Sequence, residues 1–301
     1  CFLDKSSTFD LTAYKKLKKY ISDHEIDIVH AHSSSYFLVS MIKIFGKRNF
    51  KLVWHDHYGN SDFLEERPKF LLRSFSRYFD GIISVNKKLE NWAIENLKCS
   101  IIKVFRNFLP SNEIKVDPSI SLKGDSKTFK FICVANLRPQ KDHLTLIKAF
   151  EELDKDDTNL HLVGKDFKDA YCRKVITRIK ESSKCEQIFI YGSQDNVNAL
   201  LLQADAGVLS SKSEGLPLAL LEYGAAGLPI ICTNVGECET VLEDFGILVE
   251  PSNSSALAKG MSEIYSDETY IIKAEAFQKK VALKYSETAN LAEILKFYQS
   301  I

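Results

Sequence analysis

The chain has 301 residues with 40 basic and 40 acidic side chains, so its formal charge at pH 7 is zero and no nucleic-acid partner is expected. Its 45% hydrophobic residues can fill the cores of two domains, yet no stretch of 18 apolar residues predicts a membrane-spanning helix. The seven cysteines are scattered and lack Cys-x-x-Cys pairs, which is typical of reduced thiols in a cytoplasmic protein.

The first third of the chain alternates short apolar segments with amphipathic ones. This pattern predicts strands at 26–31, 51–54, 81–85 and 101–105, and helices at 11–24, 36–45, 67–79 and 88–96. Short apolar strands separated by helices form a parallel sheet that is covered on both faces. We therefore expect an α/β domain over residues 1–112.

The second domain, expected over residues 113–285, repeats this plan after a polar connection at 111–127 that can include a short edge element. Its strands are predicted at 129–134, 160–163, 187–191, 206–209, 229–232 and 246–249. A helical pattern at 287–298 predicts a C-terminal helix within 286–301 that can pack back towards the first domain. Since doubly wound sheets bind ligands beyond the carboxyl ends of their strands, we expect two Rossmann-like domains facing across a cleft.

The segment from Leu209 to Thr233 carries the strongest functional signal in the sequence. Glu214 and Gly215 follow a predicted strand, and a helix of about ten residues is expected to begin at Pro217 and end before Gly227. The N-terminus of a helix offers free N–H groups and the positive end of the helix dipole. Both features favour a bound phosphate at this turn.

A second carboxylate lies on the same predicted helix. Glu222 falls on one helical face with Leu218, Leu221 and Ala225. A charge among apolar neighbours is costly unless it is paired, and the vicinal hydroxyls of a sugar could pair with it. A half-exposed carboxylate at the edge of the stripe, or one that caps a neighbouring N–H, is the equally weighted alternative.

The whole segment, LSSKSEGLPLALLEYGAAGLPIICT, resembles the signature of retaining, nucleotide-sugar-dependent glycosyltransferases of family 4, which have the GT-B fold. The resemblance implies that Glu214 and the N–H groups of Gly215 and Leu216 face the donor sugar and its phosphate. It also implies that Glu222 holds the ribose of the nucleotide. The family begins with a strand and a glycine-rich loop, whereas CFLDKSSTFDL corresponds to a later helix, so we expect this sequence to lack that N-terminal element.

Further donor contacts are expected in three loops of the second domain. Arg138 and Lys141 can supply a planar fork and a point charge to a diphosphate, although two ordinary surface cations in a solvated loop are the alternative. The resemblance favours the diphosphate role and implies backbone contacts with the nucleotide at Gly164, Tyr191 and Ser193. A glycine that follows a strand is otherwise a turn residue. Backbone contacts do not distinguish a UDP-sugar from a GDP-sugar, and no further cofactor is expected.

Two predicted strand ends in the first domain carry paired histidines, His30 with His32 and His55 with His57. Imidazoles at short spacing suit zinc, but no nearby cysteine or carboxylate completes an evident ligand set, so we expect no metal. The resemblance places His57 near the reacting sugar, with His55 as the fallback if the register slips by two. This histidine would donate a hydrogen bond to the sugar or phosphate rather than act as a nucleophile.

The predicted helix at 67–79 interleaves four cations, Arg67, Lys69, Arg73 and Arg77, with aromatic and leucine side chains. Such a helix could dock on anionic lipid as a peripheral membrane element. We favour the simpler interpretation, an ordinary helix of the domain with a solvated basic face.

The residues and the resemblance together predict a metal-independent retaining glycosyltransferase of the hexosyltransferase type, located in the cytoplasm or at the inner face of the membrane. It would transfer a sugar to a glycan or lipid-linked saccharide in cell-surface polysaccharide synthesis. Arg138, Lys141 and the N–H groups after Glu214 would stabilise the leaving diphosphate, while domain closure excludes water. A sugar-nucleotide epimerase and a catalytically silent nucleotide-sugar-binding module are the alternatives. A dehydrogenase is disfavoured because no G-x-G-x-x-G follows a predicted strand.

Overall fold

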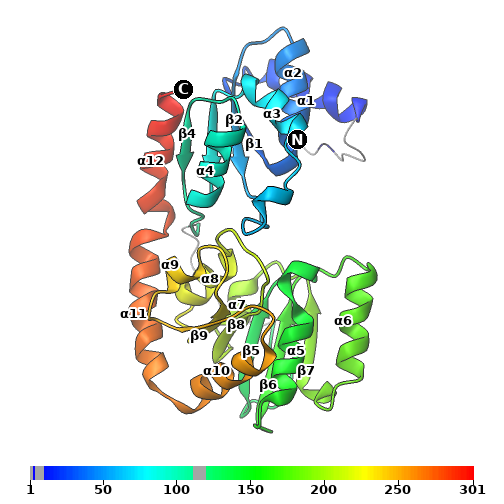
Figure 1. Ribbon diagram of the computed structural model, residues 1–301, viewed down its shortest axis with the longest axis vertical. Coiled ribbons are helices and arrows are strands. Elements are labelled where there is room, and N and C mark those ends of the chain that lie inside the picture. The colour runs from blue at the N-terminus through cyan, green and yellow to red at the C-terminus, as the bar shows by residue number, and fades with distance from the viewer. Residues whose placement is uncertain (1–2, 4–9, 111–119) are drawn as a thin grey trace. The chain divides into compact units, whose positions relative to one another are not determined.

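The computed structural model describes residue 3, residues 10–110 and residues 120–301 (Figure 1). The chain divides into two units, Cys1–Arg106 with Ala292–Ile301, and Asn107–Leu291. Each unit holds a parallel sheet with helices, which confirms the predicted α/β class. The domain boundary predicted after residue 112, and any edge element within 111–119, lie outside the described residues.

The first unit is built on a four-stranded parallel sheet in the order β1-β2-β3-β4. Its strands are β1 (Ile28–His32), β2 (Lys51–Asp56), β3 (Gly81–Ser84) and β4 (Ile102–Val104). Its helices are α1 (Leu11–Asp23), α2 (Tyr36–Phe45), α3 (Phe70–Phe75) and α4 (Lys87–Asn96), with 3₁₀ turns at Ser33–Ser35, Leu64–Glu66 and Ser76–Tyr78. The end of α12 (Glu287–Gln299) also belongs to this unit.

Alternation along the strands of the first unit fills a core on each face of the sheet. Leu52 and Trp54 belong to the cluster that includes residues of α1 to α4. Val53 and Ile83 point the other way and pack with Phe297 of α12, whose side chain is fully buried. This period-two pattern explains why the strands are near-continuous apolar runs, as expected for a parallel sheet covered on both faces.

The helix predicted at 67–79 is shorter than expected. The structure has α3 over Phe70–Phe75, followed by the 3₁₀ turn at Ser76–Tyr78. Arg67 has extended backbone angles of −70° and 121°, because the ring of the following Pro68 disfavours the helical conformation in the residue before it. The prediction of a helix from residue 67 was therefore wrong at its start.

The second unit holds a six-stranded sheet in the order β10-β9-β8-β5-β6-β7, in which every described pairing is parallel. The strands are β5 (Phe129–Val134), β6 (Thr158–Val163), β7 (Ile188–Gly192), β8 (Ala206–Leu209), β9 (Ile230–Thr233) and β10 (Ile247–Val249). The helices are α5 (His143–Glu152), α6 (Ala170–Lys180), α7 (Val197–Leu201), α8 (Leu218–Ala225), α9 (Cys238–Leu242), α10 (Ser254–Ser266), α11 (Thr269–Lys284) and the start of α12, with 3₁₀ turns at Pro139–Lys141 and Cys185–Gln187.

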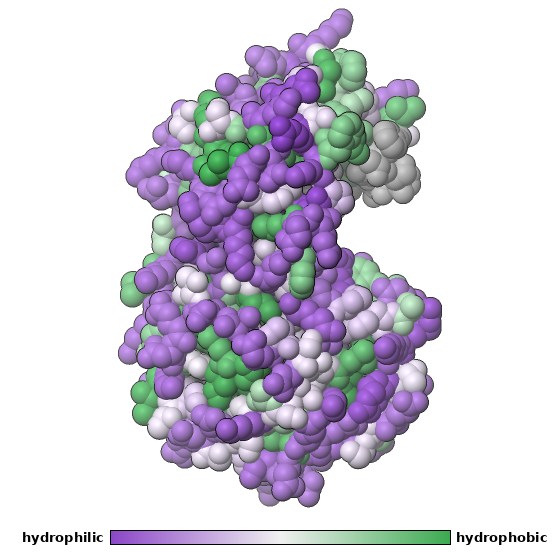
Figure 2. Space-filling view, viewed as in Figure 1, coloured by the Kyte–Doolittle hydropathy of each residue, from purple (hydrophilic) through white to green (hydrophobic). Residues whose placement is uncertain are grey.

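Two cores cover the faces of the second sheet. One cluster joins alternate strand residues to α5, α6 and α10, and the other joins the intervening residues to α7, α8, α9 and α11. Among the residues that the structure describes, no helix has both the length and the apolar character that crossing a bilayer requires. The face of the molecule shown in Figure 2 is mostly hydrophilic, with small groups of hydrophobic residues between the polar ones.

Truncation of the buried aromatic ring of α12 tests the packing of the first unit. We expect Phe297→Ala to lower the free energy of unfolding of that unit by about 3–5 kcal/mol, because it leaves a cavity against Val53 and Ile83. Both tryptophans of the chain, Trp54 and Trp92, lie in this unit, so denaturant unfolding followed by their fluorescence reports on it alone. The exposed Leu295→Ala on the same helix is the control, with an expected change within about 0.5 kcal/mol. Equal effects of the two variants would contradict the packing described.

Candidate functional site

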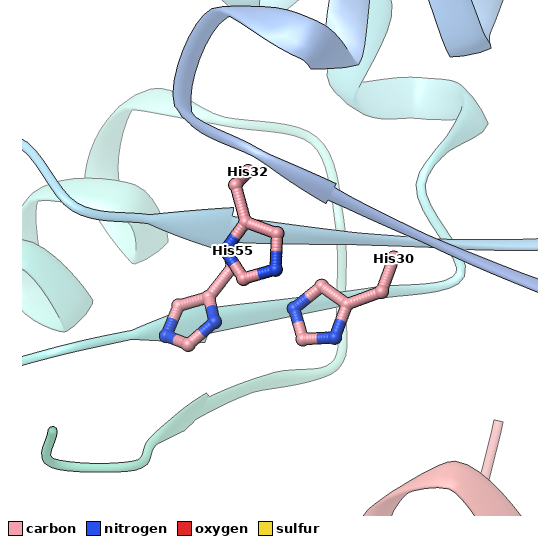
Figure 3. A group of neighbouring side chains, drawn as sticks. All are labelled: His30, His32 and His55. Carbon is pink, nitrogen blue, oxygen red and sulfur yellow. The ribbon is translucent and has the colours of Figure 1, made fainter. Parts of the chain in front are cut away.

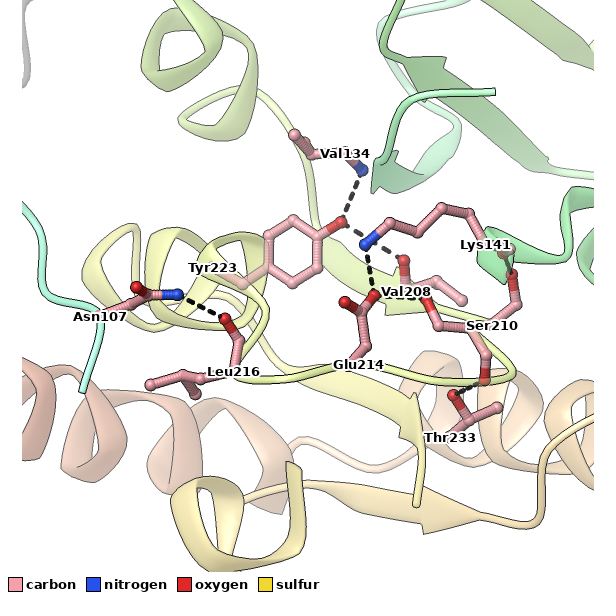
Figure 4. Close-up of polar contacts among 10 residues, drawn as sticks. Asn107, Val134, Lys141, Val208, Ser210, Glu214, Leu216, Tyr223 and Thr233 are labelled. Atoms are coloured by element: carbon pink, nitrogen blue, oxygen red, sulfur yellow. Dashed lines mark hydrogen bonds and ion pairs between the residues drawn. The ribbon is translucent and has the colours of Figure 1, made fainter. Parts of the chain in front are cut away.

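The loop after β8 is joined to the loop between β5 and α5 by a partly buried ion pair (Figure 4). Glu214 is only 5% exposed, and its carboxylate pairs with the ammonium of Lys141. The hydroxyl of Ser211 donates a second hydrogen bond to this carboxylate at 2.7 Å, and that of Ser210 donates to the carbonyl of Lys141 at 2.9 Å. The structure thus brings together two of the predicted site residues, which lie 73 positions apart in the sequence.

The turn that follows Glu214 is held through its carbonyl groups. The side-chain amide of Asn107 donates to the carbonyl of Leu216 at 2.9 Å, and the N–H of Glu237 donates to that of Gly215 at 2.9 Å. Gly236 has a φ of 57°, and a Cβ at this position would lie 2.3 Å from the carbonyl oxygen of Glu214. Only glycine fits there.

Unlike its carbonyls, the N–H groups of Gly215 and Leu216 in this turn have no hydrogen-bond partner among the described residues. The helix that follows begins at Leu218 rather than at Pro217 and has eight residues, because Pro217 keeps an extended ψ of 122° and forms the N-cap. A turn whose carbonyls are used and whose N–H groups are free offers donors to an anion.

Glu222 lies one turn further along α8 and lines a cavity of about 540 Å³ within the second unit. The cavity is also lined by polar side chains, among them Asn198 of α7, Gln278 of α11 and Tyr285 at the end of α11. Glu222 is half-buried, and burial raises the pKa of its carboxyl group. It pairs with no other side chain and caps no N–H among the described residues. The predicted apolar stripe is incomplete, since Leu218 is exposed to solvent.

Arg138 does not join the ion pair of Lys141 and Glu214. It is exposed, and its guanidinium carbon lies 4.6 Å from the centroid of the Phe167 ring, in the loop between β6 and α6. Stacking on an aromatic face orders a guanidinium while its N–H groups stay available. Phe167 was not predicted as a site residue from the sequence. Its signal was an aromatic residue in the loop that follows a predicted strand and Gly164.

The loops after β5, β6 and β7 are hydrogen-bonded to one another around Gly164. A Cβ on Gly164 would lie 2.1 Å from the carbonyl oxygen of Ala135, so no other residue fits this position. Its N–H donates to the carbonyl of Gly192 at 2.9 Å, and the N–H of Leu137 donates to that of Lys165 at 3.0 Å. Gly164 therefore has a packing role, while its contact with a nucleotide stays a prediction.

The two remaining predicted contacts differ in accessibility. The phenol oxygen of Tyr191 accepts a hydrogen bond from the N–H of Lys123 at 2.6 Å and lies 2.9 Å from Nδ1 of His161. The carbonyl of Tyr191 accepts from the side-chain amide of Gln194 at 2.8 Å. Ser193 is exposed. Side chain and carbonyl of Tyr191 thus already have partners, whereas Ser193 is accessible.

In the first unit, four histidines gather on one face of the β1–β2 pair; we call them the histidine cluster (His30, His32, His55 and His57). The parallel register pairs His32 with His55, and the rings of His55 and His57 lie 3.9 Å apart between centroids. Nδ1 of His32 lies 2.9 Å from Nε2 of His57. Burial lowers the pKa of His57 to about 4, so this imidazole is neutral at pH 7 and carries one N–H.

Between His55 and His57, Asp56 at the end of β2 points to the opposite face and forms a bidentate pair with Arg67 at 2.7 and 2.8 Å. The guanidinium carbon of Arg67 lies 4.3 Å from the ring centroid of Tyr58 and 4.2 Å from that of Trp92. Arg67 is 8% exposed, so its assignment to a solvated basic face was wrong. The pair anchors the segment that presents His57.

Comparison with known proteins decides the family. Residues 119–283 match the model described as Glycosyl transferases group 1, and residues 1–111 match the model described as Glycosyltransferase Family 4. The chain belongs to the group 1 glycosyl transferases. The resemblance to family 4 is thereby confirmed.

Relatives of this glycosyltransferase include the N-acetyl-alpha-D-glucosaminyl L-malate synthase of Bacillus anthracis, 27% identical over 276 residues that cover 86% of this chain and 71% of the relative. An N-acetylgalactosamine-N,N'-diacetylbacillosaminyl-diphospho-undecaprenol 4-alpha-N-acetylgalactosaminyltransferase of Campylobacter jejuni is 26% identical, with coverages of 94% and 78%. Among solved structures, Anabaena Alr3699/HepE in complex with UDP-glucose aligns with a TM-score of 0.83 at 18% identity and coverages of 96% and 82%. The predicted GT-B fold is confirmed.

The raised pKa of Glu222 leads to a stability prediction. Because folding raises this pKa, the favourable contribution of the carboxyl group is present below its ordinary pKa and is lost as the pH rises through the folded value. At about pH 8 the wild type carries a partly buried charge that Glu222→Gln lacks, so the variant should unfold at a higher temperature.

The gain from Glu222→Gln should shrink towards about pH 4, where both side chains are neutral. Calorimetric unfolding at the two pH values measures it, with the exposed Glu275→Gln of α11 as the matched control. A variant less stable than the wild type at the higher pH would show that the carboxylate has a stabilising partner instead.

Proposed function

We propose that this glycosyltransferase transfers a hexosyl group from a UDP-sugar or GDP-sugar, with retention of configuration, to a glycan or lipid-linked saccharide in cell-surface polysaccharide synthesis. The observation that carries the proposal is the partly buried Lys141–Glu214 pair beside the N–H groups of Gly215 and Leu216, which have no partner among the described residues. A cation and two amides at one turn form a binding site for the phosphate that leaves with the nucleotide.

The main requirement of this reaction is stabilisation of the negative charge that develops on the departing diphosphate. An ammonium has three N–H donors, so Lys141 can keep its bond to Glu214 and still donate to a phosphate oxygen. Arg138, ordered by Phe167, adds a bidentate donor. These cations and the amides supply the electrostatic stabilisation, so no metal ion is required at the diphosphate. Glu214 orients Lys141 and faces the donor sugar.

The nucleotide itself would occupy the neighbouring loops of the second unit. Glu222 lines a cavity and has no side-chain partner in the part of the chain that the structure describes, so it is suited to accept hydrogen bonds from the two ribose hydroxyls. The backbone at Gly164 and the accessible Ser193 would then lie along the base, together with Tyr191. These roles follow the family resemblance, and the half-buried carboxylate of Glu222 is the geometric feature that supports them.

His57 would contribute a hydrogen bond to the sugar or its phosphate. Its neutral imidazole has one N–H to donate, and the Asp56–Arg67 pair fixes the strand end from which it projects. It does not act as a nucleophile. In a retaining transfer of this kind, the bond between the sugar and the donor diphosphate breaks while the glycosidic bond to the acceptor oxygen forms on the same face. A phosphate oxygen of the leaving nucleoside diphosphate takes the proton of the acceptor hydroxyl.

The proposed acceptor class rests on the names of two relatives, and the proposed location rests on the exposed surface of α3. The Campylobacter jejuni relative and an Escherichia coli relative are named for acceptors on diphospho-undecaprenol and diphosphoundecaprenol. On α3 of this chain, Phe70 is 82% exposed beside exposed Lys69 and Arg73. An exposed aromatic residue flanked by cations suits the boundary of an anionic bilayer. The proposal therefore includes a cytoplasmic location and, in place of an ordinary solvated face for this helix, peripheral binding at the inner membrane face.

Incubation of the full-length protein with a panel of UDP- and GDP-sugars and lipid-diphosphate saccharide acceptors tests the proposal. Release of nucleoside diphosphate that depends on the acceptor, with an α-linked product from an α-linked donor, is the expected result. Release of epimer or free sugar without acceptor would instead indicate an epimerase. Nucleotide binding without turnover would indicate a silent binding module and overturn the proposal.

A substitution at the arginine tests the electrostatic mechanism. We expect Arg138→Ala to lower kcat/KM by roughly 10²-fold, as removal of a preorganised donor to developing charge typically does. Its unfolding temperature should not change, because the side chain is exposed and its ring contact is a surface one. The exposed Lys174→Ala of α6 is the control for loss of one positive charge. Equal turnover by the two variants would exclude Arg138 from the reaction.

A further inference from the structure

The histidine cluster of the first unit has the geometry of a ligand set. Residues two apart on a strand point to the same face, so His30 and His32 of β1 lie beside His55 of β2 (Figure 3). One ring nitrogen from each of these three residues lies within 4.8 Å of the other two. The rings of His30 and His32 stack at 4.5 Å, and each lies 5.1 Å from that of His55.

The ring nitrogens of this cluster are incompletely used by the protein. Both nitrogens of His55 and Nε2 of His30 are buried and have no hydrogen-bond partner within residues 10–110 and 120–301. Buried polar atoms in native proteins almost always have a partner, so three such atoms within one small cluster require an explanation. The remaining contacts of the cluster, between His32 and His57 and between His30 and Tyr298, leave these three atoms unsatisfied.

The hydroxyl group of Tyr298 contacts the imidazole of His30 through the ring nitrogen that faces away from the cluster. The phenol oxygen of Tyr298 lies 2.5 Å from Nδ1 of His30. In metal sites, a ligating histidine typically uses its other ring nitrogen in a hydrogen bond that fixes the orientation of the ring. Here that bond directs Nε2 of His30 into the cluster. His32, in contrast, is exposed and leaves a path by which an ion could enter.

We propose that His30, His32 and His55 bind a divalent transition-metal cation of the zinc class. Zinc is bound by imidazole at about 2.0–2.1 Å, so the three nitrogens would approach to roughly 3.4 Å of one another, by rotation of side chains that already face one point. Three protein ligands leave a fourth position for a water molecule or another ligand. The ion would link the ends of β1 and β2, with the ring of His30 oriented by Tyr298. Its ligands are distinct from Arg138, Lys141, Gly215 and Leu216, while His32 contacts His57.

Metal binding by the full-length protein, produced without a histidine tag and freed of metal by chelation, tests this site. Calorimetric titration with Zn²⁺ is expected to show one ion per chain, and Co²⁺ should give the intense visible absorption of a tetrahedral complex. His55→Gln should weaken Zn²⁺ binding by at least roughly tenfold. His24→Ala, which removes an exposed histidine at the end of α1, is the matched control and should bind as the wild type does.

A further variant covers the case in which His55→Gln fails to fold, as judged by its circular dichroism. Tyr298→Phe keeps the ring and removes only the supporting hydroxyl, and loss of such a group typically costs 10–100-fold in metal affinity. Absence of Zn²⁺ binding by the wild type, unchanged affinity in Tyr298→Phe, or an equal loss in His24→Ala would overturn the proposal. Nucleotide binding, measured in parallel on the same samples, distinguishes this failure from a failure of the proposed transferase function.

Discussion

The ion pair between Lys141 and the buried carboxylate of Glu214 is the constraint on which the candidate site of the second unit depends. A carboxylate removed from water needs its partners, because loss of one leaves a buried charge that costs several kcal/mol. Ser211 and Lys141 satisfy that need only while the loops after β5 and β8 stay together. Since Glu237 and Asn107 hold the carbonyls of the same turn, the N–H groups of Gly215 and Leu216, which have no partner among the described residues, are left for a ligand. Stability and function thus draw on one small network.

Most of the secondary structure could be predicted because strands that are buried on both faces consist of short runs of apolar residues. β5 and β8 begin and end at the predicted residues, and the end of α8 before Gly227 was also predicted. Errors arose where a distant partner or a neighbouring proline decided the local structure. Arg67 looked like a surface cation, since nothing near it in sequence shows that Asp56 and two aromatic rings enclose it. Non-local pairing of this kind leaves no periodic signal.

The site was predictable to the same extent and for the same reason. Lys141 and Glu214 follow strands that are neighbours in the sheet, and the carboxyl ends of neighbouring parallel strands meet at one edge. A sequence pattern can therefore bring them together. It cannot give the direction in which a loop side chain leaves the backbone, which is why the stacking of Arg138 on Phe167 was missed. It also cannot show that the cavity beside Glu222 involves Gln278 of α11.

The end of β2 shows how alternation lets one strand serve two purposes. His55 and His57 lie on one face, while Asp56 between them points to the other and is locked by Arg67. Because the lock acts on the backbone between the two imidazoles, it limits the rotation of both without contacting either. If the strand end were flexible, the histidines could separate and their ring nitrogens could form hydrogen bonds with water. Fixed in this way, they stay packed, and both nitrogens of His55 lack a partner among the described residues, as the proposed metal ligand set requires.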